Sequence, residues 1–598
     1  MLKRISVRML AIAATLSLSA SAQSGIGPES TVERNVPMQT RDGVTLRADI
    51  YRPGKDGIAA EGQFPVLLER TPYNKDGGND FGRRASARGF MVVIQDVRGR
   101  YASDGEWYTF KHESEDGYDA VEWAAALPHS NGKVGMWGGS YVGATQMLAA
   151  IAHPPHLAGI CPVVTASNYH ENWTYQGGAL EQWFDQSWGA GLAQDTLNRE
   201  IRHDTNAMTS REMLPLTAFP LFNLKPSLTE ANLTRTLAPY YLDWLAHPEY
   251  DDYWKQWAID EHYESIQVPA LTVAAWYDIF QGGSLRNFIG LKAHAGNENA
   301  RKQQHLLVTI GGHAGGGRLI GDTDFGPAAT EYDENTITLD WYDYLFLGKQ
   351  NSFATEKPVK IFVMGSNQWR YEDTWPLLRA KETRYLLHSD GKANTASGDG
   401  MLSTDAAKNA PSDTYVYDPL NAVPTTGGPL CCDSDHLGPG PRDQRSVESR
   451  NDVLVYTTPP LDRDMEVTGL VSLDLFAKSS AADTDFTGKL VDVAPDGSAH
   501  NLTEGILRAR YRNSTSHAEP IEPGKVYEYK IDLWSTSNVF LKGHRIRLEI
   551  SSSNFPRFDR NLNTGKPAAG SSEAIKATNT ILHDSEHPSA LILPVVAP

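Results

Sequence analysis

Apolar residues along the chain change their spacing three times, and these changes divide it into regions of different predicted structure. Up to about residue 166, short continuous apolar runs such as 64–68 and 91–94 alternate with segments of helical periodicity such as 115–126. Continuous runs are typical of strands buried on both faces of a parallel sheet. Their alternation with helices predicts an α/β domain.

The second region is rich in tryptophan and tyrosine and has no strand-like runs, so we expect a helical cap inserted into the α/β domain. The sheet pattern then resumes, and a helix over 328–347 is expected to close it. Short β-like runs separated by turns follow, which predicts an all-β jelly-roll. The expected boundaries are 23–166 and 268–356 for the α/β-hydrolase domain, 167–267 for the cap and 357–598 for the jelly-roll.

The N-terminus has the pattern of a secretory signal peptide. Lys3, Arg4 and Arg8 precede an apolar stretch, and Ala20-Ser21-Ala22 provides an A-x-A cleavage site before Gln23. The alternative is an uncleaved N-terminal helix. We expect residues 1–22 to be removed and the protein to be exported, to the periplasm or the medium, with no membrane span.

Charge and cysteine content exclude some functions. The formal net charge is -18 and basic residues are not clustered, which argues against a nucleic-acid partner. Of the three cysteines, Cys431 and Cys432 are adjacent and Cys161 lies in an apolar run. They are interpreted as buried or partly buried thiols, with a vicinal disulfide or a bridge to Cys161 as the alternatives. No Cys/His spacing matches a zinc site, so no metal is expected.

Gly138-Gly139-Ser140-Tyr141-Val142-Gly143 follows a predicted strand and opens a predicted helix, which is the context of a nucleophile elbow. The sharp turn needs small neighbours, and the helix N-terminus favours a developing oxyanion. The usual pattern is G-x-S-x-G, and here the second glycine comes one residue later. We predict that Ser140 is a nucleophile; the alternative is a glycine turn with a phosphate-binding or packing role.

A nucleophilic serine needs a base and an acid that orients it, in the chain order Ser, Asp/Glu, His. Asp278 and His313 each follow a predicted strand, in that order. His294 and His305 are alternatives for the base, but neither ends a strand. The alternative for Asp278 is a helix cap.

Four segments, QDVRGRYASDGEW, GMWGGSYVGATQ, AAWYDIFQGGSL and TIGGH, resemble the motifs of the cocaine-esterase-like (CocE/NonD) hydrolases of the X-Pro dipeptidyl-peptidase superfamily. That superfamily includes α-amino-acid ester hydrolases and glutaryl acylases. The resemblance covers nearly the whole mature chain. It implies an α/β-hydrolase domain with an inserted cap, followed by a galactose-binding-like jelly-roll.

The resemblance also implies residue roles. Ser140, Asp278 and His313 match the triad, Tyr73 matches the tyrosine whose hydroxyl forms half of the oxyanion hole, and the Tyr141 N–H would form the other half. Gly311-Gly312 stand where relatives have a Gly-Pro-Trp-like stretch. No metal or organic cofactor is required for such a reaction.

The expected substrate is a small ester or amide with an uncharged acyl group, because the residues after Asp278 carry no charge. Trp173, Trp276 and Phe280 are predicted to line the pocket. Dipeptidyl-peptidase or β-lactam acylase activity is the alternative, with Glu171 as a candidate anion for a free N-terminus. The sequence leaves a homo-oligomer open.

The segment with Asp96, Arg98 and Arg100 is interpreted as a charged structural scaffold beside the elbow. A rival of another class is a catalytically silent carbohydrate-binding protein, since jelly-rolls support many functions.

Overall fold

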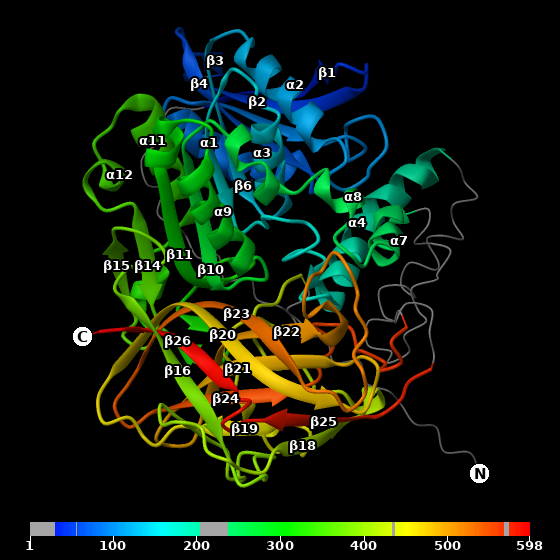
Figure 1. The fold of residues 1–598 in the computed structure, drawn as a ribbon. Coiled ribbons are helices and arrows are strands. Elements are labelled where there is room, and N and C mark those ends of the chain that lie inside the picture. The colour runs from blue at the N-terminus through cyan, green and yellow to red at the C-terminus, as the bar shows by residue number, and fades with distance from the viewer. Residues whose placement is uncertain (1–29, 56, 204–236, 433–436, 567–572, 598) are drawn as a thin grey trace, which may run out of the picture.

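The computed structural model describes residues 30–55, 57–203, 237–432, 437–566 and 573–597. The predicted signal peptide lies outside these residues. An α/β part and a β-rich part pack against each other, and a group of helices flanks them on one side (Figure 1). The predicted fold class, an α/β-hydrolase domain followed by an all-β domain, is confirmed.

The α/β part is built on one mixed sheet with the order β1-β2-β5-β4-β6-β7-β10-β11-β14-β15. Every neighbouring pair from β5 to β14 is parallel, whereas β1, β2 and β15 add antiparallel edges. The bounds are β1 Ser30–Gln39, β2 Thr45–Lys55, β4 Phe64–Thr71, β5 Met91–Asp96, β6 Ser130–Gly139, β7 Leu157–Val163, β10 Ala270–Tyr277, β11 Gln304–Gly312, β14 Val359–Val363 and β15 Gln368–Glu372.

Helices cover both faces of this sheet, which explains why the strands are apolar throughout. On β4, Val66 and Leu68 pack in the cluster that holds α2 (Glu113–Ala125) and α3 (Tyr141–Ile151). Leu67, on the opposite face, packs with α1 (Asn79–Ala87) and α11 (Glu334–Leu347). Further along the sheet, α9 (Gln281–His294) follows β10.

Two expectations about this domain need correction. The helix expected over 328–347 is a 3-10 turn at Pro327–Thr330 followed by α11, which begins only at Glu334 because Asp333 caps it by accepting from Thr336 N at 2.7 Å. The β domain was expected from residue 357, but β14 and β15 belong to the first sheet. A short apolar run looks the same in either sheet, so the sequence alone misplaces this boundary.

The cap between β7 and β10 contains α4 (Gln182–His203), α7 (Pro239–Ala246) and α8 (Asp252–Lys255). It also contains a hairpin of two-residue strands, β8 (Tyr175–Gln176) and β9 (Ala179–Leu180), although no strand was expected here. These strands are too short to leave a periodic pattern. Their turn, Gly177-Gly178, has φ values of 54° and 79° and lies against the β-rich part, where a Cβ on Gly177 would be 2.2 Å from Ile506 O.

The β-rich part is one sheet of 11 strands with the path β18-β25-β20-β26-β16-β17-β19-β24-β21-β22, and β23 pairs with β20. It folds over itself into a sandwich (Figure 1). Its bounds are β16 Ala380–His388, β17 Met401–Ser403, β18 Asp413–Tyr417, β19 Leu454–Thr457, β20 Met465–Ser479, β21 Asp485–Val493, β22 Ala499–Arg508, β23 Tyr527–Phe540, β24 Arg545–Ser551, β25 Ala577–Leu582 and β26 Ala590–Val596.

Buried contacts join the β-rich part to both other regions. The guanidinium of Arg557, buried between the parts, pairs with Glu504 at 2.7 Å and with Glu181 of the cap at 3.3 Å. Gln281, at the start of α9, exchanges two hydrogen bonds with the backbone of Ser535. The β-rich part therefore supports the elements that carry the residues after β10.

The structure joins Cys431 and Cys432 in a vicinal disulfide, so the interpretation of these two residues as thiols was wrong. Cys161 is a buried free thiol, as expected. Within the described ranges, no helix is both long and apolar enough to span a bilayer.

Candidate active site

Ser140 occupies the turn between β6 and α3 with φ 63° and ψ -126°, a conformation that side-chain-bearing residues rarely adopt. Its neighbours explain the glycine pattern. A Cβ on Gly138 would be 2.4 Å from Val142 Cγ1, and a Cβ on Gly143 would be 2.8 Å from Thr165 Cβ. The second glycine is therefore needed one residue later than usual, where α3 passes close to Thr165.

Asp278 and His313 reach Ser140 from the two strands predicted to carry them. Asp278 follows β10 and His313 follows β11, and these strands are parallel neighbours whose carboxyl ends meet at one edge. His313 Nε2 lies 2.9 Å from Ser140 Oγ, and His313 Nδ1 lies 2.6 Å from Asp278 Oδ1. Asp278 is fully buried, and its other oxygen accepts from Phe280 N at 2.9 Å. The carboxylate is thus fixed toward the imidazole.

Steric contacts also explain why positions 311 and 312 are glycine. A Cβ on Gly311 would be 2.3 Å from Gly315 O, and one on Gly312 would be 2.7 Å from Pro439 Cγ of the β-rich part. The chain after β11 turns back tightly beneath Pro439, and only glycine fits there. This close packing brings His313 to the edge of the sheet.

Tyr73 lies on the loop after β4, beside the nucleophile. Trp188 donates from its indole N–H to Tyr73 Oη at 3.0 Å, which leaves the phenol proton of Tyr73 available for another acceptor. Although 39% of Tyr73 is open to solvent, its surroundings desolvate the hydroxyl and raise its pKa. Hydrogen bonding to Trp188, to Ser140 and to the Tyr141 backbone opposes that rise in pKa. The hydroxyl is therefore a protonated donor close to Ser140 and to the Tyr141 backbone.

Aromatic side chains form a wall next to His313. Trp173 stacks on Phe280 with ring centroids 4.4 Å apart, and Phe280 lies 5.2 Å from the His313 ring. Phe184 and Trp188 of α4 complete the wall with edge contacts to Trp173 at 5.4 Å. Sequence reasoning missed these two, although their i, i+4 spacing in a tryptophan-rich helix was the available signal.

Trp276 does not line this wall, which corrects a predicted pocket residue. Its indole N–H donates to Phe362 O at 2.7 Å, and its ring lies 5.8 Å from Trp375, in the core shared with the β-rich part. Because β10 is buried on both faces, an apolar residue on it does not reveal which layer it faces. In this case Trp276 faces the layer formed by the β domain.

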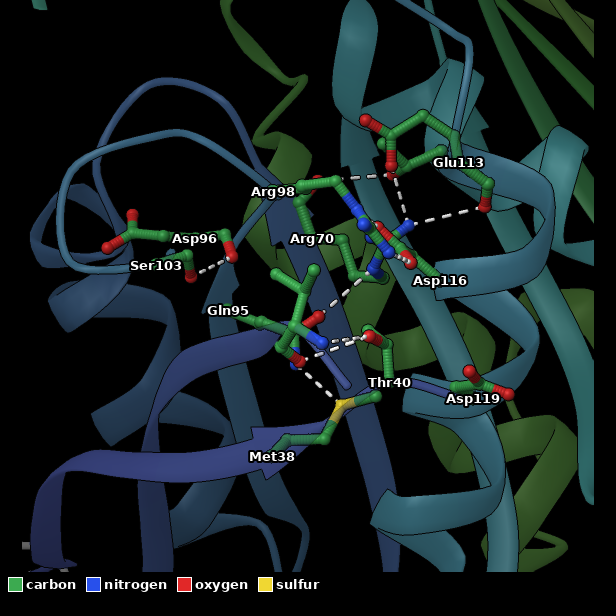
Figure 2. Close-up of polar contacts among 12 residues, drawn as sticks. Met38, Thr40, Arg70, Gln95, Asp96, Arg98, Ser103, Glu113, Asp116 and Asp119 are labelled. Atoms are coloured by element: carbon green, nitrogen blue, oxygen red, sulfur yellow. Dashed lines mark hydrogen bonds and ion pairs between the residues drawn. The ribbon is translucent and has the colours of Figure 1, made fainter. Parts of the chain in front are cut away.

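The charged segment after β5 forms a buried scaffold beside the elbow, as the sequence indicated. Arg98 pairs with Asp116 at 2.6 Å and with Asp42 at 2.7 Å (Figure 2 shows Arg98 and Asp116). Arg100 donates to Pro72 O at 3.0 Å, so it holds the loop that carries Tyr73.

Asp96 accepts from Lys75 N at 2.8 Å and from Ala102 N at 3.2 Å, and burial raises its pKa to about 6. None of its hydrogen bonds reaches Ser140, Asp278 or His313 among the described residues. Its contacts are those of a structural group that ties the loop after β4 to the loop after β5.

Glu171, the candidate anion for a substrate ammonium, is already partnered. Its carboxylate lies 3.5 Å from His170 Nδ1 and accepts from Gly177 N at 3.3 Å, and these contacts with His170 lower its pKa against the effect of burial. It therefore serves the β8–β9 hairpin. Among the described residues, no three His, Cys, Asp or Glu side chains are grouped so that they could hold a metal ion.

Two family models match most of this chain. The family model "X-Pro dipeptidyl-peptidase (S15 family)" matches residues 42–315, and "X-Pro dipeptidyl-peptidase C-terminal non-catalytic domain" matches residues 351–592. The chain is 39% identical to a cocaine esterase of Rhodococcus sp. (strain MB1 Bresler) over 95% of this chain and 99% of that protein.

Two solved structures share the whole architecture. An aminopeptidase from a marine sediment Thaumarchaeota archaeon is 26% identical with a TM-score of 0.78, covering 97% of this chain and 99% of its own. An α-amino acid ester hydrolase is 22% identical with a TM-score of 0.77, covering 98% and 100%. The chain therefore belongs to the cocaine-esterase-like serine hydrolases of the X-Pro dipeptidyl-peptidase S15 family.

Proposed function

We propose that this chain hydrolyses an ester or amide bond of a small acyl substrate through an acyl-enzyme on Ser140. The position of the His313 imidazole, 2.9 Å from Ser140 Oγ and 2.6 Å from Asp278 Oδ1, carries the proposal. His313 Nε2 takes the hydroxyl proton as Ser140 Oγ attacks the carbonyl carbon, and then gives that proton to the leaving alcohol or amine. Water then attacks the acyl-enzyme with the same help from His313, and the acid is released. Asp278 holds the imidazole tautomer and stabilises its cation.

The tetrahedral oxyanion is assigned to the Tyr73 hydroxyl and the Tyr141 backbone N–H. Two observations support this assignment. Trp188 occupies one lone pair of the Tyr73 oxygen, so the phenol proton is free to point at the substrate. Tyr141 is the first residue of α3, where backbone N–H groups have no partner within the helix. One such donor is worth about 100-fold or more in rate.

The aromatic wall supports an uncharged, apolar acyl group. Phe280 lies beside the His313 ring and stacks on Trp173, and both rings contact Phe184, so the side chains next to the imidazole are aromatic. Glu171 contacts His170 and the Gly177 N–H within the cap, which argues against it as the partner of a substrate ammonium. A relative named cocaine esterase agrees with an ester as the preferred bond.

We also propose that the chain is exported after cleavage before Gln23, on the signal-peptide pattern of its first 22 residues. The mature protein would then act in the periplasm or the medium.

The test is a hydrolysis panel with the mature protein and its Ser140→Ala variant: p-nitrophenyl acetate and butyrate, p-nitrophenyl benzoate, phenylglycine methyl ester and glycyl-prolyl-p-nitroanilide. The expected result is turnover of neutral esters that disappears in the variant. Preference for phenylglycine methyl ester or for the glycyl-prolyl amide would refute the uncharged acyl pocket. Ester turnover that survives Ser140→Ala would refute the catalytic assignment.

A further inference from the structure

A buried polar chain of three side chains lies directly behind the elbow. The phenol of Tyr141, fully buried, donates to Glu113 Oε1 at 3.0 Å and accepts from Phe110 N at 2.7 Å. The second carboxylate oxygen of Glu113 accepts from Arg70 Nη1 at 2.7 Å (Figure 2 shows Arg70 and Glu113). Glu113 is 4% exposed and Arg70 is fully buried. Both carboxylate oxygens of Glu113 and the Tyr141 phenol therefore have hydrogen-bond partners in this buried group.

The protonation states of Tyr141 and Glu113 determine which group donates in their hydrogen bond. Burial raises the pKa of Tyr141 well above its usual value, so the phenol keeps its proton and is the donor to Glu113. Burial also raises the pKa of Glu113, while the adjacent Arg70 cation opposes that rise. An ion pair buried in this way is often no more stabilising than apolar residues of the same volume, which suggests a role other than stability.

This buried polar chain of three side chains connects the elements that lead to both proposed oxyanion donors. Tyr141 is the residue whose backbone N–H is one donor, and its ring is held by stacking on Phe110 at 5.2 Å as well as by Glu113. Arg70 is on β4, three residues before Tyr73, the other donor. Thr145 of α3 donates to Arg70 O at 3.1 Å and adds a second link between α3 and β4.

We propose that Glu113 is a positioning residue for the oxyanion hole: by binding the Tyr141 phenol and Arg70 together, it fixes the Tyr141 N–H relative to the Tyr73 hydroxyl. This inference rests on the proposed function. An oxyanion donor acts over 2.7–3.1 Å, and misplacement of a reacting group by about 1 Å can cost on the order of 100-fold in rate. Glu113 itself does not touch the substrate.

The first experiment compares Glu113→Gln with Glu115→Gln, which removes the same charge from an exposed position in the first turn of α2. In Glu113→Gln the side-chain NH₂ group must face either Arg70 or Tyr141. A hydrogen-bond donor then faces another donor at that position. The measurements are kcat and KM for p-nitrophenyl butyrate, and the inhibition constant of phenylboronic acid, whose boron bonds Ser140 Oγ and becomes a tetrahedral anion. A planar competitive inhibitor, benzamide, reports on ground-state binding.

We expect kcat of Glu113→Gln to fall by about tenfold to 100-fold with KM changed less than about threefold, because only the transition state uses the hole. The affinity for phenylboronic acid should weaken in parallel with kcat, whereas that for benzamide should not change. Glu115→Gln should match wild type in all four quantities. A folded Glu113→Gln variant with wild-type kcat, or one whose benzamide and boronic acid affinities weaken equally, would overturn the inference.

If Glu113→Gln does not fold, Tyr141→Phe tests the same link, because it removes only the phenol oxygen and keeps the ring. The same pattern is expected: lower kcat, weaker boronic acid binding and unchanged benzamide binding. Wild-type kcat in Tyr141→Phe would overturn the inference. Failure of the proposed function is distinguishable, because it would show as wild-type activity that Ser140→Ala does not abolish.

Discussion

The buried carboxyl group of Glu69 on β4 should make the stability of the protein depend on pH. Replacing Glu69 should remove that dependence. Its side chain is only 9% exposed, and Oε2 has no hydrogen-bond partner in the described part of the chain. Burial first, and then the negative charges of Glu334 and Asp96, raise its pKa from 4.5 to about 8. The folded protein therefore holds a proton on Glu69 that the unfolded chain releases near pH 4.5.

The direction of this pKa shift determines whether stability rises or falls with pH. Because the folded-state pKa is the higher one, the contribution of Glu69 is most favourable below pH 4.5 and is lost as the pH rises toward 8. With about 1.4 kcal/mol for each pKa unit, the loss between pH 5 and pH 9 is about 4 kcal/mol. Glu69→Gln keeps the size of the side chain and cannot ionise, so this part of the pH dependence should disappear.

The assay is urea denaturation followed by tryptophan fluorescence at pH 5, 7 and 9. Glu61→Gln serves as the control because it removes an exposed carboxylate a few residues before β4. Relative to wild type, Glu69→Gln should gain about 4 kcal/mol in free energy of unfolding on going from pH 5 to pH 9, and Glu61→Gln should gain nothing comparable. A Glu69→Gln variant whose stability falls with pH as steeply as that of wild type would refute the reasoning.

Four further outcomes are expected. Tyr73→Phe should lower kcat for p-nitrophenyl butyrate about 100-fold at similar KM, because one oxyanion donor is lost, and an unchanged kcat would exclude that role. Asp278→Asn should lower kcat on the order of 10⁴-fold in the same steady-state assay, because the imidazole loses its orienting carboxylate; a loss below tenfold would count against the triad. Arg557→Met should reduce the free energy of unfolding by about 3–5 kcal/mol in urea, since it leaves Glu181 and Glu504 buried without their cation, and wild-type stability would contradict this. N-terminal sequencing of the exported protein should begin at Gln23, and a retained Met1 would rule out cleavage.

The sequence by itself determined the features that depend on local backbone chemistry. Continuous apolar runs predicted the parallel strands, because a strand covered on both faces has no polar side. The glycines around Ser140 predicted the elbow, because a positive φ and close approach exclude larger side chains. Asp278 and His313 followed from the same logic, since the ends of neighbouring parallel strands lie at one edge of the sheet.

Only the tertiary structure decided which side chains meet across long separations. Trp276 and Trp188 are equally aromatic in the sequence, but the first packs on the β domain and the second donates to Tyr73, which lies 115 positions away. Glu113 has the same charge as Glu115, and only packing buries it against Tyr141. Local periodicity predicts the type of the longer elements. The partner of a buried side chain depends instead on how separate elements pack, and no short stretch of sequence contains that information.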